Sequence, residues 1–169
     1  MPEKQTLARA RADRKSGKAA STQAGEFIKE EMDHIRQGLH GARSTKQAIA
    51  IGLSKARRAG VDLPPPKAGK ASASTRRRAS LDLAKGRRGT ARVSSVRSRA
   101  TLNALKKEGG QAASPEALAR QARAASAARS PAERSRSSEQ AARTKGPAVR
   151  SAAAVKAAHM RAAHQHRST

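Results

Sequence analysis

Large apolar residues are concentrated in one short segment of this chain. Of the 22 Leu, Ile, Val, Phe and Met residues, ten lie between positions 27 and 63, and the others are spread thinly over the rest of the sequence. Four of the ten recur with the period of one helical face: Ile28, Met32, Ile35 and Leu39. This spacing predicts an amphipathic helix over 22–39. Ser21 or Thr22 is expected to cap its start, and Gly38 or Gly41 to end it.

A second helix is predicted directly afterwards, over 46–59. Ser44 or Thr45 can cap its N-terminus, and Gly60 follows its last turn. The stretch 48–51 also fits a short strand, because four residues match either period. Helix is favoured, since the segment is long and both of its ends carry cap residues.

The two helices predict a hairpin over 21–63, and a pair of helices buries little apolar surface. We expect it to be marginal unless it dimerises, docks residues 3–15 as a third helix, or binds a partner. Residues 1–20 otherwise resemble a basic N-terminal arm. Three prolines at 64–66 end the hairpin, because they remove backbone donors and fix φ. Residues 64–169 form a basic, low-complexity tail.

Composition changes the picture of the tail. The 169 residues carry 37 Lys+Arg against 12 Asp+Glu, a net charge of +25, with one Phe and no Cys, Trp or Tyr. Few large apolar residues and a high net charge are typical of chains that do not stay compact. The predicted fold class is therefore mostly disordered with all-α elements: the hairpin, and a tail rich in Ala, Arg, Lys and Ser with transient helices. Ser114 and Ser130 mark helix starts, the latter in a capping box with Glu133.

The residue types and motifs of the sequence exclude most kinds of catalytic site. No thiol is present, and no glycine-rich phosphate loop is found. His159, His164 and His166 crowd the C-terminus, but solvated tail residues explain them better than a metal site. His34 is expected at the rim of the first helix. We expect no enzyme activity, no cofactor and no metal.

Charge instead points to a polyanion. Lysine and arginine neutralise phosphates and release counterions, which supplies affinity without sequence preference. With a single Phe, stacking on bases is almost unavailable, so backbone contacts on a duplex are favoured over single-strand binding. A helix-turn-helix is only a loose match. The predicted nucleic-acid-binding residues are Lys46, Lys55, Arg57, Arg58, Arg76, Arg77, Arg78, Lys85, Arg87, Arg88, Arg92, Arg97, Arg99, Lys106 and Lys107.

The two hairpin helices differ in charge, and this leaves two readings of the second helix. Residues 23–38 carry a net charge of −2, whereas residues 46–59 carry +4 and no acid. Antiparallel packing would let the helices neutralise each other. Alternatively, the second helix presents its basic face to phosphates.

One segment resembles a known group of proteins. The sequence from Thr45 to Gly60, TKQAIAIGLSKARRAG, and parts of the preceding helix are similar to an uncharacterised family of small basic bacterial proteins. Its members are often labelled DNA-binding. The resemblance implies a bacterial origin and supplies no site residues. The tail is similar, in composition only, to linker-histone tails and histone-like proteins.

Three functions remain open at this point. The first is a nonspecific, histone-like protein on duplex DNA, cytoplasmic and nucleoid-associated, with no membrane contact and with a homodimer through the hairpin as an option. The second is an RNA- or ribosome-associated basic protein. The third is an adaptor that binds a protein partner through the hairpin.

Overall fold

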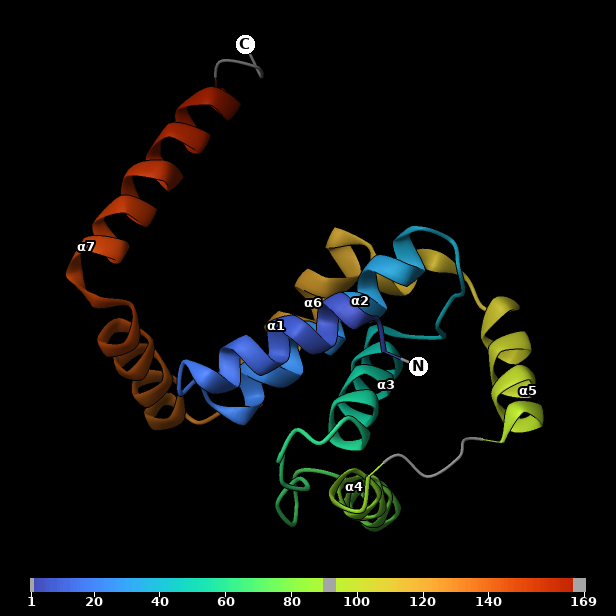
Figure 1. The fold of residues 1–169 in the computed structure, drawn as a ribbon. Coiled ribbons are helices and arrows are strands. Elements are labelled where there is room, and N and C mark those ends of the chain that lie inside the picture. Colours follow the sequence, from blue (N-terminus) through green and yellow to red (C-terminus); the bar gives the residue numbers. More distant parts are fainter. Residues whose placement is uncertain (1, 90–93, 166–169) are drawn as a thin grey trace. The chain divides into compact units, whose positions relative to one another are not determined.

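The chain is an all-helical protein in its computed structural model, which describes residues 2–89 and 94–165 (Figure 1). The chain forms two compact units, Met1–Gln121 and Ala122–Thr169. In chain order the elements are α1 (Lys4–Lys15), α2 (Ala20–Arg36), α3 (Thr45–Arg58), α4 (Ala73–Arg87), α5 (Ser95–Lys106), the 3₁₀ turn η1 (Gly110–Ala113), α6 (Pro115–Ala127) and α7 (Pro131–Gln165).

The predicted hairpin is present as α2 and α3. Ser44 caps α3 by accepting a hydrogen bond from the Gln47 N–H at 3.2 Å, as expected. Gly38 follows α2 with φ +71°, the left-handed conformation that ends helices, and this prediction is also confirmed. The predicted cap of α2 was wrong, because α2 begins at Ala20 without a side-chain cap. Leu39 lies beyond the helix end and is 51% exposed.

The N-terminal residues dock on this hairpin as α1, one of the three ways in which the hairpin was expected to become stable. Figure 1 shows α1 lying along α2. Ala10 of α1 packs with Ala24 and Phe27 of α2, and Phe27 is fully buried. Arg9 extends from the same helix and pairs with Glu26 at 2.6 Å. Residues 4–15 are therefore part of the folded unit.

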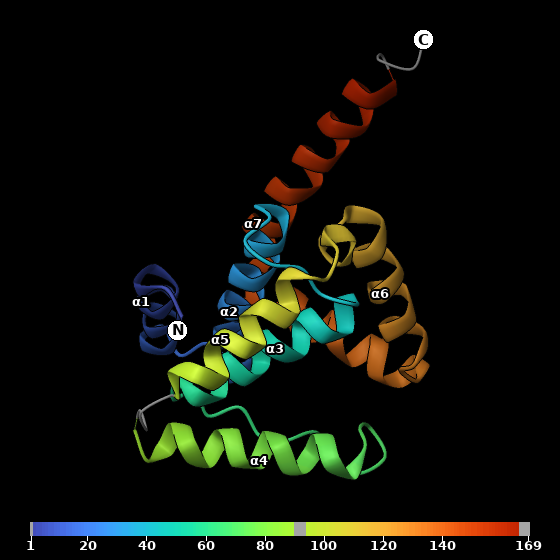
Figure 2. The ribbon, with the colours of Figure 1, turned by 90° about the vertical axis from the view of Figure 1, so that its right-hand side faces the viewer.

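α4 packs on α3 through a face of small and polar residues (Figure 2). Ala79 and Asp82 are buried on this face, and Asp82 accepts a hydrogen bond from the Ser54 hydroxyl at 2.7 Å. Gly86 lies directly against the backbone of Arg57, where a Cβ atom would overlap the carbonyl oxygen. The helices approach closely because no large side chain separates them.

Backbone carbonyls from the tail bind the loop between α2 and α3 and the start of α3. The Thr45 hydroxyl donates to the carbonyl of Ala112 at 2.7 Å. The N–H groups of Gly41 and Ala42 donate to the carbonyls of Leu105 at 2.9 Å and Gly109 at 3.2 Å. These bonds join residues far apart in sequence, so η1 is fastened to the hairpin.

The prediction of a mostly disordered chain is wrong, since helices cover most of the described residues and those of the first unit pack together. The reason lies in the residues that form the core. Nine of the thirteen buried hydrophobic residues among those described are alanines. A count of large apolar side chains underestimates this core, because it leaves out the packing of alanines and the hydrogen bonds between polar groups beside them.

The second unit consists of the end of α6 and α7. Ser130 and Glu133 form the predicted capping box, with reciprocal hydrogen bonds at 2.9 and 3.2 Å. Gly146 has φ +69° and interrupts α7 before Pro147, so two helical segments follow each other. Large apolar residues such as Val149 and Met160 are exposed there.

Candidate nucleic-acid interface

α4 carries a cluster of cations on the face that points away from α3. Arg77, Arg78, Lys85 and Arg88, the residue that caps α4, are all exposed. At about 100° per residue, these four positions fall within an arc of about 100°. The buried positions 79 and 82 and the close-contact position 86 lie on the other side of the helix, so packing against α3 orients the arc outward. We call these four residues the α4 cation face.

Two further arginines of α4, Arg76 and Arg87, lie together on one side of the helix, outside this arc. Arg87 pairs with Asp62 at 2.8 Å, and both side chains are exposed. An exposed pair contributes about 0–1 kcal/mol, so a phosphate can replace Asp62. Arg76 is half-buried, and its Nε has no hydrogen-bond partner among the described residues. It therefore belongs more to the packing side than to the α4 cation face.

α5 adds a second group of exposed cations. Arg97, Arg99, Lys106 and Lys107, which caps α5, are all exposed, and α5 contains no buried residue. Arg92, predicted as another contact, lies outside the described residues. The α5 residues thus remain accessible to a large polyanion.

The predicted residues of α3 divide into two pairs. Lys46 and Arg58 are exposed. Lys55 instead points inward, where its Nζ lies 2.6 Å from a carboxylate oxygen of Glu31. Arg57 is buried, and this burial lowers its pKa. The negative charge of Asp82 raises the pKa of Arg57, but by less than burial lowers it. Lys55 and Arg57 are therefore not placed to contact a nucleic acid.

Arg57 has a structural role. Its Nε donates to the carbonyl of Leu63 at 3.1 Å, and its Nη2 donates to that of Pro64 at 3.3 Å. Proline segments lack N–H donors, so they are held by their carbonyls. The arginine thereby fixes the turn that sends the chain from α3 towards α4.

The acids of the first unit are largely used within the fold. Among the described residues up to 121, nine of ten carboxylates have an ion-pair or hydrogen-bond partner. The nine are Glu3, Asp13, Glu26, Glu30, Glu31, Asp33, Asp62, Asp82 and Glu108. None of these nine acids is paired with a residue of the α4 cation face, so its four cations give the surface a positive potential.

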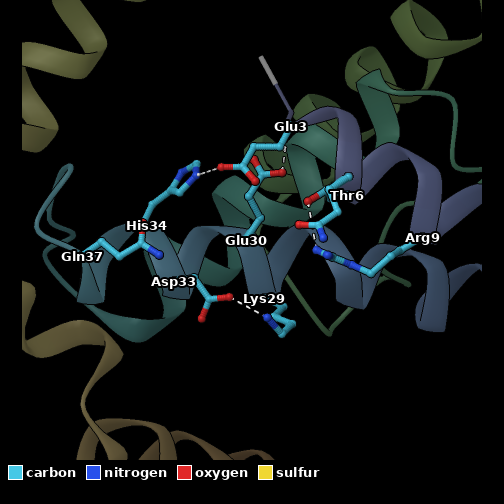
Figure 3. A pocket seen from close by; sticks show the side chains of 9 residues that line it. Glu3, Thr6, Arg9, Lys29, Glu30, Asp33, His34 and Gln37 are labelled. Atoms are coloured by element: carbon cyan, nitrogen blue, oxygen red, sulfur yellow. Dashed lines mark hydrogen bonds and ion pairs between the residues drawn. The ribbon is translucent and has the colours of Figure 1, made fainter.

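A small polar hollow of about 150 Å³ lies between α1 and α2 (Figure 3). Two pairs of its charged side chains already interact with one another. His34 Nε2 lies 2.9 Å from Glu3, and Lys29 Nζ lies 2.6 Å from Asp33. The hollow contains both signs of charge, so it does not select an anion.

A buried cluster beside this hollow was missed by sequence reasoning. Glu30 and Glu31 are both buried next to Lys55. One ligand atom each from Glu31, His34 and His40 lies within 4.8 Å of the others, so these three residues could hold a metal ion. The signal was spacing: Glu31 is four residues from both Phe27 and Ile35, on the apolar face of α2.

Comparison with known proteins finds a family model that is similar to the N-terminal part of the chain. Residues 4–67 match a family model described as Family of unknown function (DUF6496). The resemblance to an uncharacterised family is thus confirmed over α1, α2, α3 and the prolines, whereas bacterial origin and DNA binding stay predictions. No curated protein and no solved structure matched the chain. None of the helices in the described ranges combines the length and apolar character that crossing a bilayer requires.

Proposed function

We propose that this protein binds duplex DNA without sequence preference, through phosphate contacts made by the α4 cation face. In this role it is a histone-like, nucleoid-associated protein. The observation that carries the proposal is the division of charge in the first unit. Nine of its ten acids have a partner within the unit, while the four cations of α4 are exposed on one side.

The dimensions of the α4 cation face suit a duplex. At a rise of about 1.5 Å per residue, positions 77 to 88 span about 16 Å. Phosphates along one DNA strand are spaced by about 3.4 Å of helix axis, so several lie within this length. Long arginine and lysine side chains can reach phosphates on either side of the helix. The exposed cations of α5 add further contacts and do not need a fixed register.

Base readout is not part of the proposal. The α4 cation face contains no Asn, Gln or aromatic residue, and the neighbouring Leu81 is apolar and 56% exposed. Phe27 is fully buried and cannot stack on a base. If charge alone governs recognition, the affinity is expected to follow the density of phosphates and not the base sequence.

The other two functions receive less support. An RNA duplex also presents phosphates, so charge alone does not separate it from DNA. The adaptor hypothesis relied on an open acidic helix. In the folded unit, α1, α3 and η1 cover α2, and its acids Glu26, Glu30, Glu31 and Asp33 are paired.

A salt titration of the full chain tests the proposal. Its affinity for a mixed-sequence DNA duplex of 20–30 base pairs is measured by fluorescence anisotropy at several salt concentrations. Four phosphate contacts predict that log K falls against log salt with a slope of about −3.6, and α5 contacts make it steeper. A second duplex with a scrambled sequence is expected to bind equally well.

Competition decides between DNA and RNA. A structured RNA of equal phosphate number is added to the preformed DNA complex, and the displaced fraction is recorded. The proposal requires that RNA displaces DNA no better than unlabelled DNA does. Preferential displacement by RNA would move the assignment to an RNA-associated protein, and undetectable DNA binding near 0.15 M salt would end it.

A further inference from the structure

We propose that Glu31, His34 and His40 form a binding site for Zn²⁺ or a similar divalent transition-metal ion. The ligand set is one carboxylate and two imidazoles, which are ordinary zinc ligands. Glu31 and His34 belong to α2, and His40 lies in the loop that follows it. This site is independent of the α4 cation face and of DNA binding.

The distances suit a single ion. One ligand atom from each residue lies within 4.8 Å of the others, and Glu31 Oε1 lies 3.4 Å from His40 Nε2. Bonds of about 2.0–2.2 Å at tetrahedral angles place two zinc ligands about 3.3 Å apart. Glu31 and His40 are therefore already spaced as ligands of one ion, and the His34 ligand atom, within 4.8 Å of both, would move closer to complete the set.

The burial of Glu31 gives an independent reason to expect a cation. Its side chain is 1% exposed, and neither carboxylate oxygen accepts a hydrogen bond from the described residues. Lys55 forms an ion pair with Oε2 and also contacts Glu30. Two buried carboxylates thus share one ammonium group, which leaves a net charge of −1. An uncompensated buried charge is costly, and a cation beside Oε1 would remove the cost.

The hydrogen bonds of the histidines fix which ring nitrogen is free. His40 Nδ1 lies 3.1 Å from the carbonyl oxygen of Gly41, so this nitrogen carries the hydrogen and donates it. In the neutral ring, Nε2 then aims a lone pair at the Glu31 carboxylate. That repulsion is relieved by a proton or by a metal ion bound between the two atoms. A ligating histidine with its other nitrogen held by a carbonyl is the usual arrangement at metal sites.

His34 has a matching support. Its Nε2 donates to the Glu3 carboxylate at 2.9 Å, which leaves Nδ1 as the nitrogen with a lone pair (Figure 3). The rings of His34 and His40 lie edge to face, with centroids 5.8 Å apart. Both histidines thus have one nitrogen held by an oxygen and one free, as two ligands of the same ion require.

Metal titrations of the full chain test the proposal. Co²⁺ serves as a coloured probe and Zn²⁺ as its competitor, at pH 7.5, where a neutral histidine can ligate. We expect one ion per chain, with the strong visible absorption of a four-coordinate cobalt site that Zn²⁺ removes. The variants His34→Gln and His40→Gln are expected to weaken binding by at least tenfold.

His159→Gln is the matched control, because His159 is exposed on α7. It is expected to leave the affinity unchanged. Circular dichroism shows whether each variant keeps its helices. His40 is more buried than His34, so if His40→Gln unfolds, the binding measured with His34→Gln is the test. The proposal is overturned if no ion binds, if His159→Gln removes the binding, or if neither His34→Gln nor His40→Gln changes it.

Discussion

At the scale of single residues, the protein buries charge where its apolar side chains are few. Glu30 and Glu31 are adjacent on α2, and both lie inside the unit beside Lys55. Burial raises the pKa of Glu30, but hydrogen bonds from Thr6 and from the Glu3 N–H, together with Lys55, outweigh it, and the net pKa is lowered. The ionised carboxylate therefore stabilises the folded state.

The first prediction concerns Glu30→Gln. A folded-state pKa below the unfolded value means that the carboxylate stabilises the fold above about pH 4.3, and that this contribution is lost as the pH falls through the folded pKa. We expect the variant to lower the free energy of unfolding by about 1.5–3 kcal/mol at pH 7. The difference from wild type is expected to shrink below pH 4. Urea unfolding at pH 7 and at pH 3 measures both values.

Asp33→Asn supplies the control, because Asp33 pairs with Lys29 in a more exposed position. It is expected to cost less than about 1 kcal/mol at either pH. A Glu30→Gln effect that is equally large at pH 7 and pH 3 would contradict the role of the ionised carboxylate.

At the scale of helices, small residues let the elements approach closely. A Cβ atom at Gly52 of α3 would lie 2.8 Å from Ile28 Cα of α2, and Gly86 of α4 touches the Arg57 backbone. The sequence predicted α2, α3, the Ser44 cap and the Gly38 stop, because these signals are local. It did not predict that α4 packs on α3, because a face of Ala, Asp and Gly has no large apolar residue to mark it.

The variant Gly86→Ala tests this contact. Its Cβ would overlap the carbonyl oxygen of Arg57, so α4 must shift away from α3. We expect the free energy of unfolding to fall by about 1–3 kcal/mol, as overpacking does elsewhere. Hydrogen exchange of the α4 amides is expected to speed up with it.

Gly25→Ala is the comparison, because Gly25 lies within α2 and a Cβ there meets nothing within 4 Å. This change is expected to stabilise the protein by about 0.5–1 kcal/mol, the ordinary advantage of alanine over glycine in a helix. If Gly86→Ala also stabilised the protein, the close packing of α4 on α3 would be disproved.

At the scale of the whole molecule, folding divides the charged residues behind the net charge of +25 into paired groups and exposed cations. Charge density and scarce apolar residues predicted a disordered tail, yet the tail supplies α4 and η1 to the folded unit. Thr45 and the loop before it bind backbone carbonyls of η1, of the residue before it and of the end of α5, which no side-chain pattern reveals. Most of the predicted binding residues are exposed, as expected for lysines and arginines. Lys55 and Arg57 instead point inward, because Lys55 pairs with a buried acid and Arg57 donates hydrogen bonds to carbonyls of the segment that enters the prolines.

The central claim is that DNA phosphates contact the α4 cation face rather than net charge in general. Two variants of the full chain remove the same four charges by substitution with Gln. One changes the α4 cation face: Arg77, Arg78, Lys85 and Arg88. The other changes four exposed cations of α1: Lys4, Arg11, Arg14 and Lys15.

The decisive measurement is the slope of log K against log salt for both variants on the same DNA duplex. We expect the α4 variant to lose about 3.6 from the magnitude of the slope, with a large fall in affinity, and the α1 variant to keep the wild-type slope. Equal losses in the two variants would show that net charge alone governs binding. An unchanged slope in the α4 variant would contradict the proposed interface.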